Sequence, residues 1–215
     1  MPKIHFMTPC YGGNITEACF NSYLQWTAFA VKEKVSFDLD TLANESNVNK
    51  ARNSCAAKFL AGDATHLMFV DADIQWNTEG IIKLMSHDVD IVGGIYPQKT
   101  LPPRMVVNTI KTGKRQGNLL EVGTIGTGFM LIKRGVFEKM IECGAAKYKD
   151  VGGIAYDFYN CTIDSNGEYL TEDWSFCRRW RQLGGTVYAD TTVALAHTGY
   201  HKFMPDLGAI NNGNN

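Results

Sequence analysis

The sequence predicts an α/β protein built on a mixed, mostly parallel central sheet that is flanked by helices. Three observations predict this fold class. The apolar residues switch repeatedly between strand-like and helix-like spacing along the chain. The run 67–70 is wholly apolar, as in a strand that helices cover on both faces. Asp71-Ala72-Asp73 follows that run directly, at the edge where open α/β sheets bind ligands.

The first half of the chain carries the clearest alternation. Residues 3–8 predict a first strand, which ends at Pro9 and the turn Tyr11-Gly12-Gly13. Helical spacing follows over 16–34, and apolar residues then alternate with polar ones over 35–42, as in a half-buried strand. The elements expected after these are a helix over 47–60, a strand over 67–70, a helix over 79–85 capped by Asn77 or Thr78, and a strand over 91–94.

The second half is less regular. Two turn-like points interrupt β-prone stretches within 102–132, which predicts hairpin or mixed strands. Residues 147–169 have no clear period and are expected to form a loop that serves as a lid or acceptor surface. The remaining expected elements are helices over 134–143 and 172–183 and short strands over 186–190 and 192–196. We expect one domain over 1–206 and a polar tail or linker over 207–215, with further domains possible beyond residue 215.

Composition excludes several classes of function. The chain has 215 residues, of which 45% are hydrophobic and 20% charged, as in a soluble globular protein. A formal net charge of -1 provides no basic patch, so we expect no nucleic-acid partner. No apolar run approaches the ~20 residues of a membrane span, and no secretory signal is apparent. The six cysteines are scattered without metal-site spacing, so we expect free thiols in the cytoplasm.

The pattern Asp-x-Asp occurs three times, and position distinguishes the copies. Asp38-Leu39-Asp40 fits the solvent face of a half-buried strand, and Asp88-Val89-Asp90 precedes its strand. Only Asp71-Ala72-Asp73 follows a strand, at the ligand-binding edge. We therefore expect this triplet to be the functional copy, although the two acids could instead cap the following turn.

Two carboxylates at this position suit a divalent cation that carries a diphosphate. Hard carboxylate oxygens hold Mg²⁺ or Mn²⁺, and the ion neutralises the phosphates. Asp73 is the better candidate for direct ligation, while Asp71 can reach the metal or the ribose. A second set of polar residues consists of Glu172-Asp173 at the start of a helix, where the helix dipole favours acids, and of His197 after an apolar strand.

These motifs carry a resemblance to a known family. Arg52-Asn53, Phe69-Val70-Asp71-Ala72-Asp73, Gly126-Thr127-Gly128 and Glu172-Asp173-x-x-Phe176 occur in the order seen in GT-A glycosyltransferases. The chain resembles their inverting, family-2-type members from residue 4 to about residue 200. It is also similar to the amino-terminal domains of chlorovirus multidomain glycosyltransferases, which would place it in the cytoplasm of a host cell. The resemblance implies the Rossmann-like GT-A fold of nucleotide-diphospho-sugar transferases.

The resemblance also implies roles for individual residues. For the nucleotide and donor it implies Thr8, Pro9, Tyr11, Arg52, Asp71, Ala72, Asp73, Gly126, Thr127 and Gly128. For the metal it implies Asp73 and His197, with Asp71 as a further candidate. Asp173 matches the general base, and Glu172 competes for that role. The preceding aromatic and acidic loop offers Tyr156 and Asp157 as acceptor contacts.

The predicted function is a metal-dependent transfer, using Mn²⁺ or Mg²⁺, of a sugar from a UDP-sugar to a glycan hydroxyl with inversion. Glucose, galactose or rhamnose would fit as the donor sugar. Three alternatives stay open: a non-catalytic sugar-nucleotide or glycan-binding domain, a nucleotidyltransferase, and a retaining glycosyltransferase that uses Asp157 or Asp173 on the donor side. The nucleotidyltransferase is disfavoured because Tyr11-Gly12-Gly13 is too short and uncharged for a phosphate loop.

Overall fold

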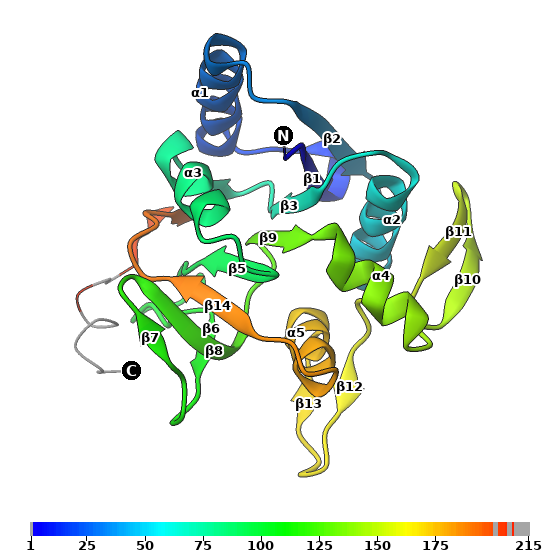
Figure 1. Cartoon of the computed structure of the whole chain (residues 1–215). Coiled ribbons are helices and arrows are strands. Elements are labelled where there is room, and N and C mark those ends of the chain that lie inside the picture. Colours follow the sequence, from blue (N-terminus) through cyan, green and yellow to red (C-terminus); the bar gives the residue numbers. More distant parts are fainter. Residues whose placement is uncertain (1, 200–201, 206–207, 209–215) are drawn as a thin grey trace.

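The computed structural model describes residues 2–199, 202–205 and 208, and its centre is a sheet of nine strands (Figure 1). The strand order is β2-β1-β3-β9-β5-β14-β8-β6, and β7 pairs with β8. The strands span Ile4–Cys10 (β1), Phe37–Ala43 (β2), His66–Val70 (β3), Ile91–Gly94 (β5), Val107–Thr109 (β6), Arg115–Gln116 (β7), Leu119–Ile125 (β8), Phe129–Lys133 (β9) and Val187–Asp190 (β14).

The sheet is mixed, as predicted. Strand β1 pairs in parallel with both β2 and β3, and β14 pairs in parallel with β5. Strands β9 and β8 run opposite to their neighbours, so the other pairings are antiparallel. Because β1 and β3 run side by side in one direction, their carboxyl ends meet at the same edge, where Asp71 follows β3.

Within the described residues, five α-helices flank the sheet, and three begin at a side chain that caps the first turn. They span Glu17–Glu33 (α1), Val48–Ala61 (α2), Thr78–Ser86 (α3), Arg134–Glu142 (α4) and Glu172–Gln182 (α5). The backbone N–H groups at Cys19, Lys50 and Gly80 donate to the side chains of Thr16, Asn47 and Asn77, respectively. Of the two predicted caps for α3, Asn77 is therefore the one that acts.

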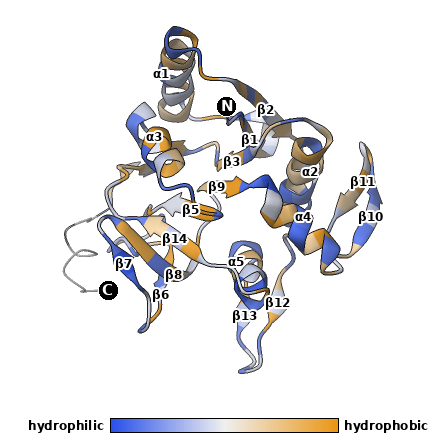
Figure 2. Cartoon of the chain, in the orientation of Figure 1, coloured by the Kyte–Doolittle hydropathy of each residue, from blue (hydrophilic) through white to orange (hydrophobic). Residues whose placement is uncertain are grey.

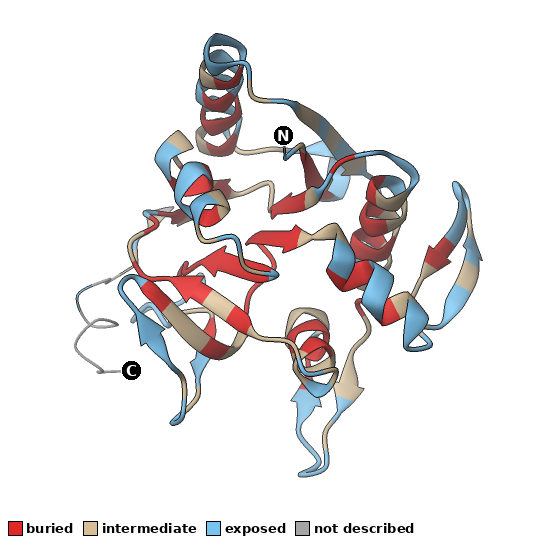
Figure 3. Cartoon of the chain, viewed as in Figure 1, coloured by how far each residue is buried: buried red, intermediate tan, exposed pale blue. Residues whose placement is uncertain are grey.

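The molecule has three layers, with helices on both faces of the sheet (Figures 1 and 3). Helices α1 and α3 cover one face, and α2, α4 and α5 cover the other. Strand β3 shows why its sequence is wholly apolar: Leu67 and Phe69 point into one core and Met68 and Val70 into the other, and all four are buried. The hydropathy colouring follows this arrangement, with hydrophobic residues concentrated in the central strands (Figure 2).

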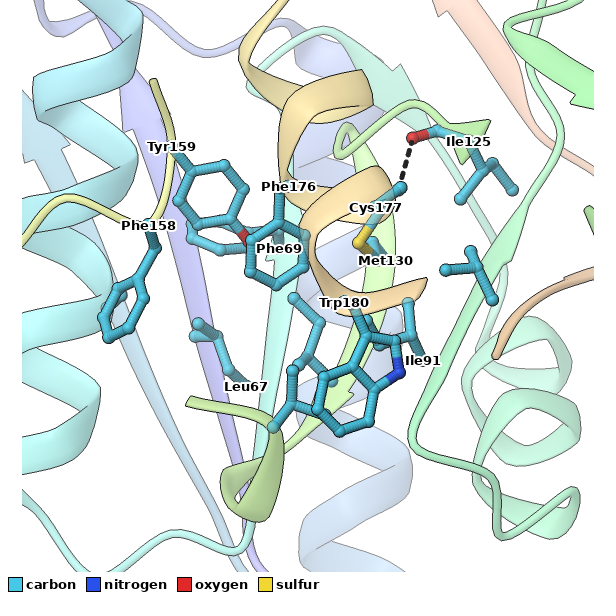
Figure 4. Close-up of a cluster of buried hydrophobic side chains, with 14 of the residues drawn as sticks. Leu67, Phe69, Ile91, Ile125, Met130, Phe158, Tyr159, Phe176, Cys177 and Trp180 are labelled. Atoms are coloured by element: carbon cyan, nitrogen blue, oxygen red, sulfur yellow. Dashed lines mark hydrogen bonds between the residues drawn. The ribbon is translucent and has the colours of Figure 1, made fainter. Parts of the chain in front are cut away.

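The core on the α5 side anchors the helix that carries the predicted base (Figure 4). The rings of Phe176 and Tyr159 stack with centroids 4.4 Å apart, and Tyr159 in turn contacts Phe69 of β3 edge-on at 5.6 Å. The Cys177 thiol lies 3.6 Å from the Ile125 carbonyl oxygen. Trp180, also buried, packs in the same cluster. These contacts hold the N-terminus of α5 at a set distance from β3.

Residues 147–169 do not form the loop that the sequence predicted. Strands Lys147–Asp150 (β10) and Gly153–Tyr156 (β11) pair as an antiparallel hairpin, and Thr162–Ile163 (β12) pairs with Tyr169–Leu170 (β13). The turn of the first hairpin requires Gly153, whose φ is 124°. Strands of two to four residues are too short for their spacing to show a period, and the prediction was wrong for this reason.

The strand expected over 192–196 is displaced to Ala196–Thr198 (β15), in a small separate sheet. It pairs there with Ile74–Gln75 (β4) and with Lys202–Phe203 (β16). The pairing with β4 has a consequence for the site, because β4 directly follows Asp73 and therefore brings His197 beside that residue.

The predicted tail, 207–215, lies outside the described residues except for Gly208. Among the described residues, none of the helices combines the length and the apolar character needed to cross a bilayer.

Candidate active site

A cleft of about 510 Å³ opens at the carboxyl ends of β1 and β3. Seven residues predicted to bind nucleotide or metal line it: Pro9, Tyr11, Arg52, Asp71, Ala72, Asp73 and His197. The other two Asp-x-Asp copies lie elsewhere. Asp88 forms an ion pair with Lys133 at the start of β5, at 2.7 Å. Asp40 contacts Lys58 and His5, and its side chain is only 32% exposed, so it does not simply face solvent as expected.

Arg52 of α2 connects the two acidic motifs. Its Nη2 lies 3.0 Å from Asp71 Oδ1, and its Nε lies 3.3 Å from Glu172 Oε1. The side chain is 5% exposed, and its guanidinium carbon lies 5.4 Å from the centre of the Phe69 ring. Burial alone would lower the pKa of Arg52, but Asp71 and Glu172 raise it, so the guanidinium stays charged. Its Nη1 is buried and has no partner among the described residues.

Asp73 lies between a histidine and a lysine. His197 Nε2 is 3.3 Å from Asp73 Oδ1, and Lys99 Nζ contacts Asp73 Oδ2. His197 Nδ1 is 2.8 Å from the Pro97 carbonyl oxygen, which can only accept, so Nδ1 carries the proton and donates. Burial tends to raise the pKa of Asp73, but His197 and Lys99 outweigh it and lower the pKa. The carboxylate is therefore ionised at neutral pH.

The ligating atoms of Asp73 and His197 fit a divalent cation whose remaining ligands come from outside the protein. Within the described part of the chain, no three His, Cys, Asp or Glu side chains gather into a ready-made metal site. However, a histidine whose Nδ1 is bonded to a carbonyl presents Nε2 in the orientation typical of metal ligands. Asp73 and His197 could thus supply two ligands, and phosphate oxygens and water the rest. Asp71 is less free, because Arg52 contacts both of its oxygens.

Asp173 and Glu172 share the first turn of α5 but have different surroundings. Glu172 contacts the charged Arg52, whereas Asp173 Oδ1 accepts hydrogen bonds from the Thr171 hydroxyl and, at 2.8 Å, from the Trp174 N–H. Burial raises the pKa of Asp173, and the neighbouring charge of Glu172 raises it further. A carboxylate with a raised pKa is a stronger base than an ordinary aspartate, which suits proton abstraction.

Tyr96 organises the glycine-containing segment beside the cleft. A Cβ at Gly126 would lie 2.2 Å from the Tyr96 hydroxyl, and one at Gly128 would lie 2.7 Å from it. The Gly128 N–H donates to the Tyr96 oxygen at 2.9 Å, while the Gly128 carbonyl accepts from the Asp71 N–H at 2.9 Å. The Tyr96 ring also contacts the His197 ring edge-on, at 5.4 Å. Tyr96 thus contacts Gly128, which holds the Asp71 backbone, and His197 itself.

Comparison with known proteins identifies the architecture. No protein-family model and no curated protein sequence matches the chain. Among solved structures, A197 from STIV superposes with a TM-score of 0.56 at 20% identity, covering 96% of this chain and 95% of that one. A Drosophila β-1,4-galactosyltransferase 7 mutant, in complex with manganese, UDP-Gal and xylobiose, superposes with a TM-score of 0.51 at 13% identity, covering 90% of this chain and 66% of that one.

GalNAc-T7, solved with UDP, GalNAc and Mn²⁺, superposes with a TM-score of 0.50 at 10% identity, covering 92% of this chain and 44% of that one. The chain has the GT-A fold. The predicted fold is thereby confirmed. This GT-A chain spans two thirds of the galactosyltransferase and under half of GalNAc-T7. The resemblance to chlorovirus domains and the single-domain boundary at residue 206 stay predictions.

Some of the predicted site residues lie away from the cleft of this GT-A domain. The Thr8 side chain is buried, and its hydroxyl lies 2.5 Å from that of Tyr23 on α1. Thr8 therefore does not line the cleft, and its side chain is unavailable to a nucleotide. Thr127 is also fully buried, and its hydroxyl has no partner among the described residues.

The proposed acceptor residues also lie elsewhere. Asp157 accepts a hydrogen bond from Asn53 at 3.1 Å and lines a separate hollow together with Asn160 and Arg179. Tyr156 packs against the core on the α5 side. The reason is the hairpin β10–β11, which packs against α2 and carries this segment away from the cleft.

Lys99, which lines the cleft, and Tyr96, which contacts His197, are two residues that sequence reasoning missed. Both follow β5, at the same edge of the sheet as Asp71. The signal was present, because the rule that selected Asp71 applies equally to the residues after the strand at 91–94.

The packing of Tyr96 makes a specific prediction for Gly128. We expect Gly128→Ala to destabilise the domain and to displace Asp71, because the new Cβ would lie 2.8 Å from Asp71 Oδ2 and 2.7 Å from the Tyr96 hydroxyl. Overpacking of this kind costs about 1–3 kcal/mol, measurable by urea denaturation. The double variant Gly128→Ala/Tyr96→Phe should recover part of the loss. Gly135→Ala, where nothing lies within 4 Å, is the control and should not destabilise. An unchanged Gly128→Ala midpoint would contradict the prediction.

Proposed function

We propose that the chain is a metal-dependent glycosyltransferase that moves a sugar from a UDP-sugar to a glycan hydroxyl with inversion, and that Asp173 is the general base. The observation that carries this proposal is that Asp73, His197 and Arg52 line one cleft, and that Arg52 also contacts Glu172 at the start of α5, next to Asp173. Arg52 thus contacts one acid of each motif, Asp71 after β3 and Glu172 at the start of α5. The scattered cysteines suit work in a reducing compartment such as the cytoplasm.

For donor binding, the cleft offers an aromatic rim and a buried cation. Tyr11 is 76% exposed at the edge of the cleft, where its ring is available to a nucleobase. Arg52 lines the cleft, and its buried Nη1 has no hydrogen-bond partner in the described part of the chain, so a ligand oxygen that reaches it would satisfy this donor. The galactosyltransferase and GalNAc-T7 of the same fold were solved with UDP-Gal and with UDP, respectively, which supports a UDP-sugar donor.

For the leaving group, the residues around Asp73 provide the positive charge. A divalent ion, when bound, neutralises the diphosphate that departs. Asp73 and His197 would hold the ion, and Pro97 keeps the Nε2 of His197 available by accepting from Nδ1. Arg52 keeps Asp71 in place beside it. Both neighbours named above were solved with manganese, which supports Mn²⁺ as the ion.

For the proton, Asp173 is better suited than Glu172. Inversion requires an acceptor hydroxyl to attack the anomeric carbon in line with the departing diphosphate while a carboxylate takes its proton. The Glu172 carboxylate is engaged in an ion pair with Arg52, at 3.3 Å. Asp173 has a raised pKa and therefore holds an abstracted proton more readily. Glu172 then acts as a positioning residue, because it holds Arg52.

A screen of nucleotide-sugars tests this function. We expect UDP linked to glucose, galactose or rhamnose to raise the unfolding temperature in the presence of Mn²⁺, because a ligand that binds only the folded state stabilises it by mass action. GDP-mannose and CMP serve as controls. Product NMR with the active donor should show an anomeric configuration opposite to that of the donor. Failure of every UDP-sugar to bind would overturn the proposal, and a retained configuration would overturn inversion.

A further inference from the structure

Lys99 lies on an exposed loop whose base is closed by backbone contacts. The loop follows β5, and an isolated bridge between Pro97 and Met105 joins its two ends. The Gln98 N–H donates to the Arg104 carbonyl at 2.7 Å just above that bridge. All residues from 98 to 104 are exposed. The loop therefore projects from a firm base, and Lys99 extends from it into the cleft.

The Lys99 ammonium contacts the carboxylate that would hold the metal ion. It touches Asp73 Oδ2, while His197 lies against Oδ1. The aliphatic part of the side chain passes close to Gly199, where a Cβ would lie 3.1 Å from Lys99 Cδ. The side chain is still 38% exposed, so solvent reaches it and it can leave Asp73 without unpacking the core.

A divalent ion and the lysine ammonium are competitors for this carboxylate. Two cations at one carboxylate oxygen repel each other, and the ion requires lone pairs that the ammonium already occupies. Lysine carries its charge on a flexible stem with four carbons, so the ammonium can move by several ångströms while the backbone stays in place. A nucleoside diphosphate carries at least two negative charges, more than enough to pair with a second cation beside the ion.

We propose that Lys99 is a donor-binding residue that exchanges partners: it pairs with Asp73 in the free protein and with the diphosphate once a divalent ion takes Asp73. This inference rests on the proposed function, whose diphosphate it needs. The base of the loop takes no part in the movement, because the Pro97 carbonyl bonded to His197 anchors it beside the metal ligand. Lys99 thus neutralises Asp73 in the free protein. Once the ion and the diphosphate are bound, it adds positive charge beside the leaving group.

Lys99→Met tests the exchange, because methionine keeps an unbranched stem and removes the charge. The first measurement is binding of Mn²⁺ alone, followed by the electron paramagnetic resonance signal of the free ion. Removal of the competing ammonium should tighten this binding by about fivefold. The second measurement is calorimetric binding of UDP in the presence of Mn²⁺, which should weaken by about tenfold, as expected for the loss of one charge-assisted hydrogen bond. Lys99→Arg, which keeps the charge, should bind UDP nearly as wild type does.

Lys111→Met is the matched control, since Lys111 is an exposed lysine in a turn that does not line the cleft. It should leave both measurements unchanged. If Lys99→Met binds Mn²⁺ alone as wild type does, Lys99 does not compete for Asp73 and the exchange is overturned. If UDP affinity is unchanged in Lys99→Met, the lysine does not reach the diphosphate and the proposal is equally overturned. Failure of the wild-type protein to bind UDP would instead overturn the proposed function, while the Mn²⁺ measurement would still report on Lys99.

Discussion

Replacing Asp173 by asparagine should lower the rate of sugar transfer by about 10²–10⁴-fold, the contribution typical of a general base. Asparagine has nearly the same shape but cannot accept the proton of the acceptor hydroxyl. UDP affinity should stay within about twofold of wild type, because Asp173 lies outside the residues that line the donor cleft. Initial rates with the donor found in the screen, together with UDP calorimetry, measure both effects.

The pH dependence of the same reaction gives an independent check on Asp173. Burial and the charge of Glu172 raise the pKa of Asp173, so the rate should fall with acidification at a higher pH than the ~3.9 of an ordinary aspartate predicts. Glu172→Gln removes the neighbouring negative charge, so the fall in rate on acidification should occur at a lower pH than in wild type. Asp88→Asn, at the opposite end of the sheet, is the control and should leave both the rate and its pH dependence unchanged. Full activity of Asp173→Asn would mean that another residue is the base.

Replacing Arg52 by methionine should cost about 3 kcal/mol of unfolding free energy, because it leaves two partly buried carboxylates without their cation. Asp71 and Glu172 are 29% and 13% exposed, respectively, so solvent compensates only part of the loss. UDP binding should fall as well, since Asp71 loses the contact that holds it. Urea denaturation and calorimetry measure the two losses.

A second variant separates charge from packing at Arg52. In Arg52→Met/Glu172→Gln one of the uncompensated charges is gone, so stability should be partly restored relative to Arg52→Met alone. Arg104→Met, at an exposed arginine of the loop after β5, is the control and should stay within about 0.5 kcal/mol of wild type. An Arg52→Met protein as stable as wild type would show that the arginine does not hold the two acids together.

The long helices and strands were predictable because the spacing of their apolar side chains indicates which faces are buried. Strand β3 is apolar at each of positions 67–70 since it faces a core on both sides, and α3 begins at Asn77, one of its two predicted caps. The short strands between 147 and 170 were not predictable in this way. Their register depends on partners elsewhere in the chain, and two to four residues cannot show an alternation.

For the site, strand polarity was the most useful rule. It directed attention to Asp71 and Asp73 among three similar triplets, and these two residues do line the cleft. The same rule applied to β5 would have pointed to Lys99. It could not show that the Thr8 side chain turns into the core toward Tyr23, or that the β10–β11 hairpin carries Asp157 away from the cleft.

By itself, the sequence determined the α/β class, the order of the main helices and strands, and the edge of the sheet where the polar residues gather. These properties follow from local periodicity and from chain direction, and both can be read from residues that are neighbours in the sequence. Only the tertiary structure decided which charges neutralise one another. Arg52 contacts Glu172 across 120 residues of sequence, and Lys99 contacts Asp73 across 26. Electrostatic pairing depends on distances in space between separate elements, and only the folded sheet sets those distances.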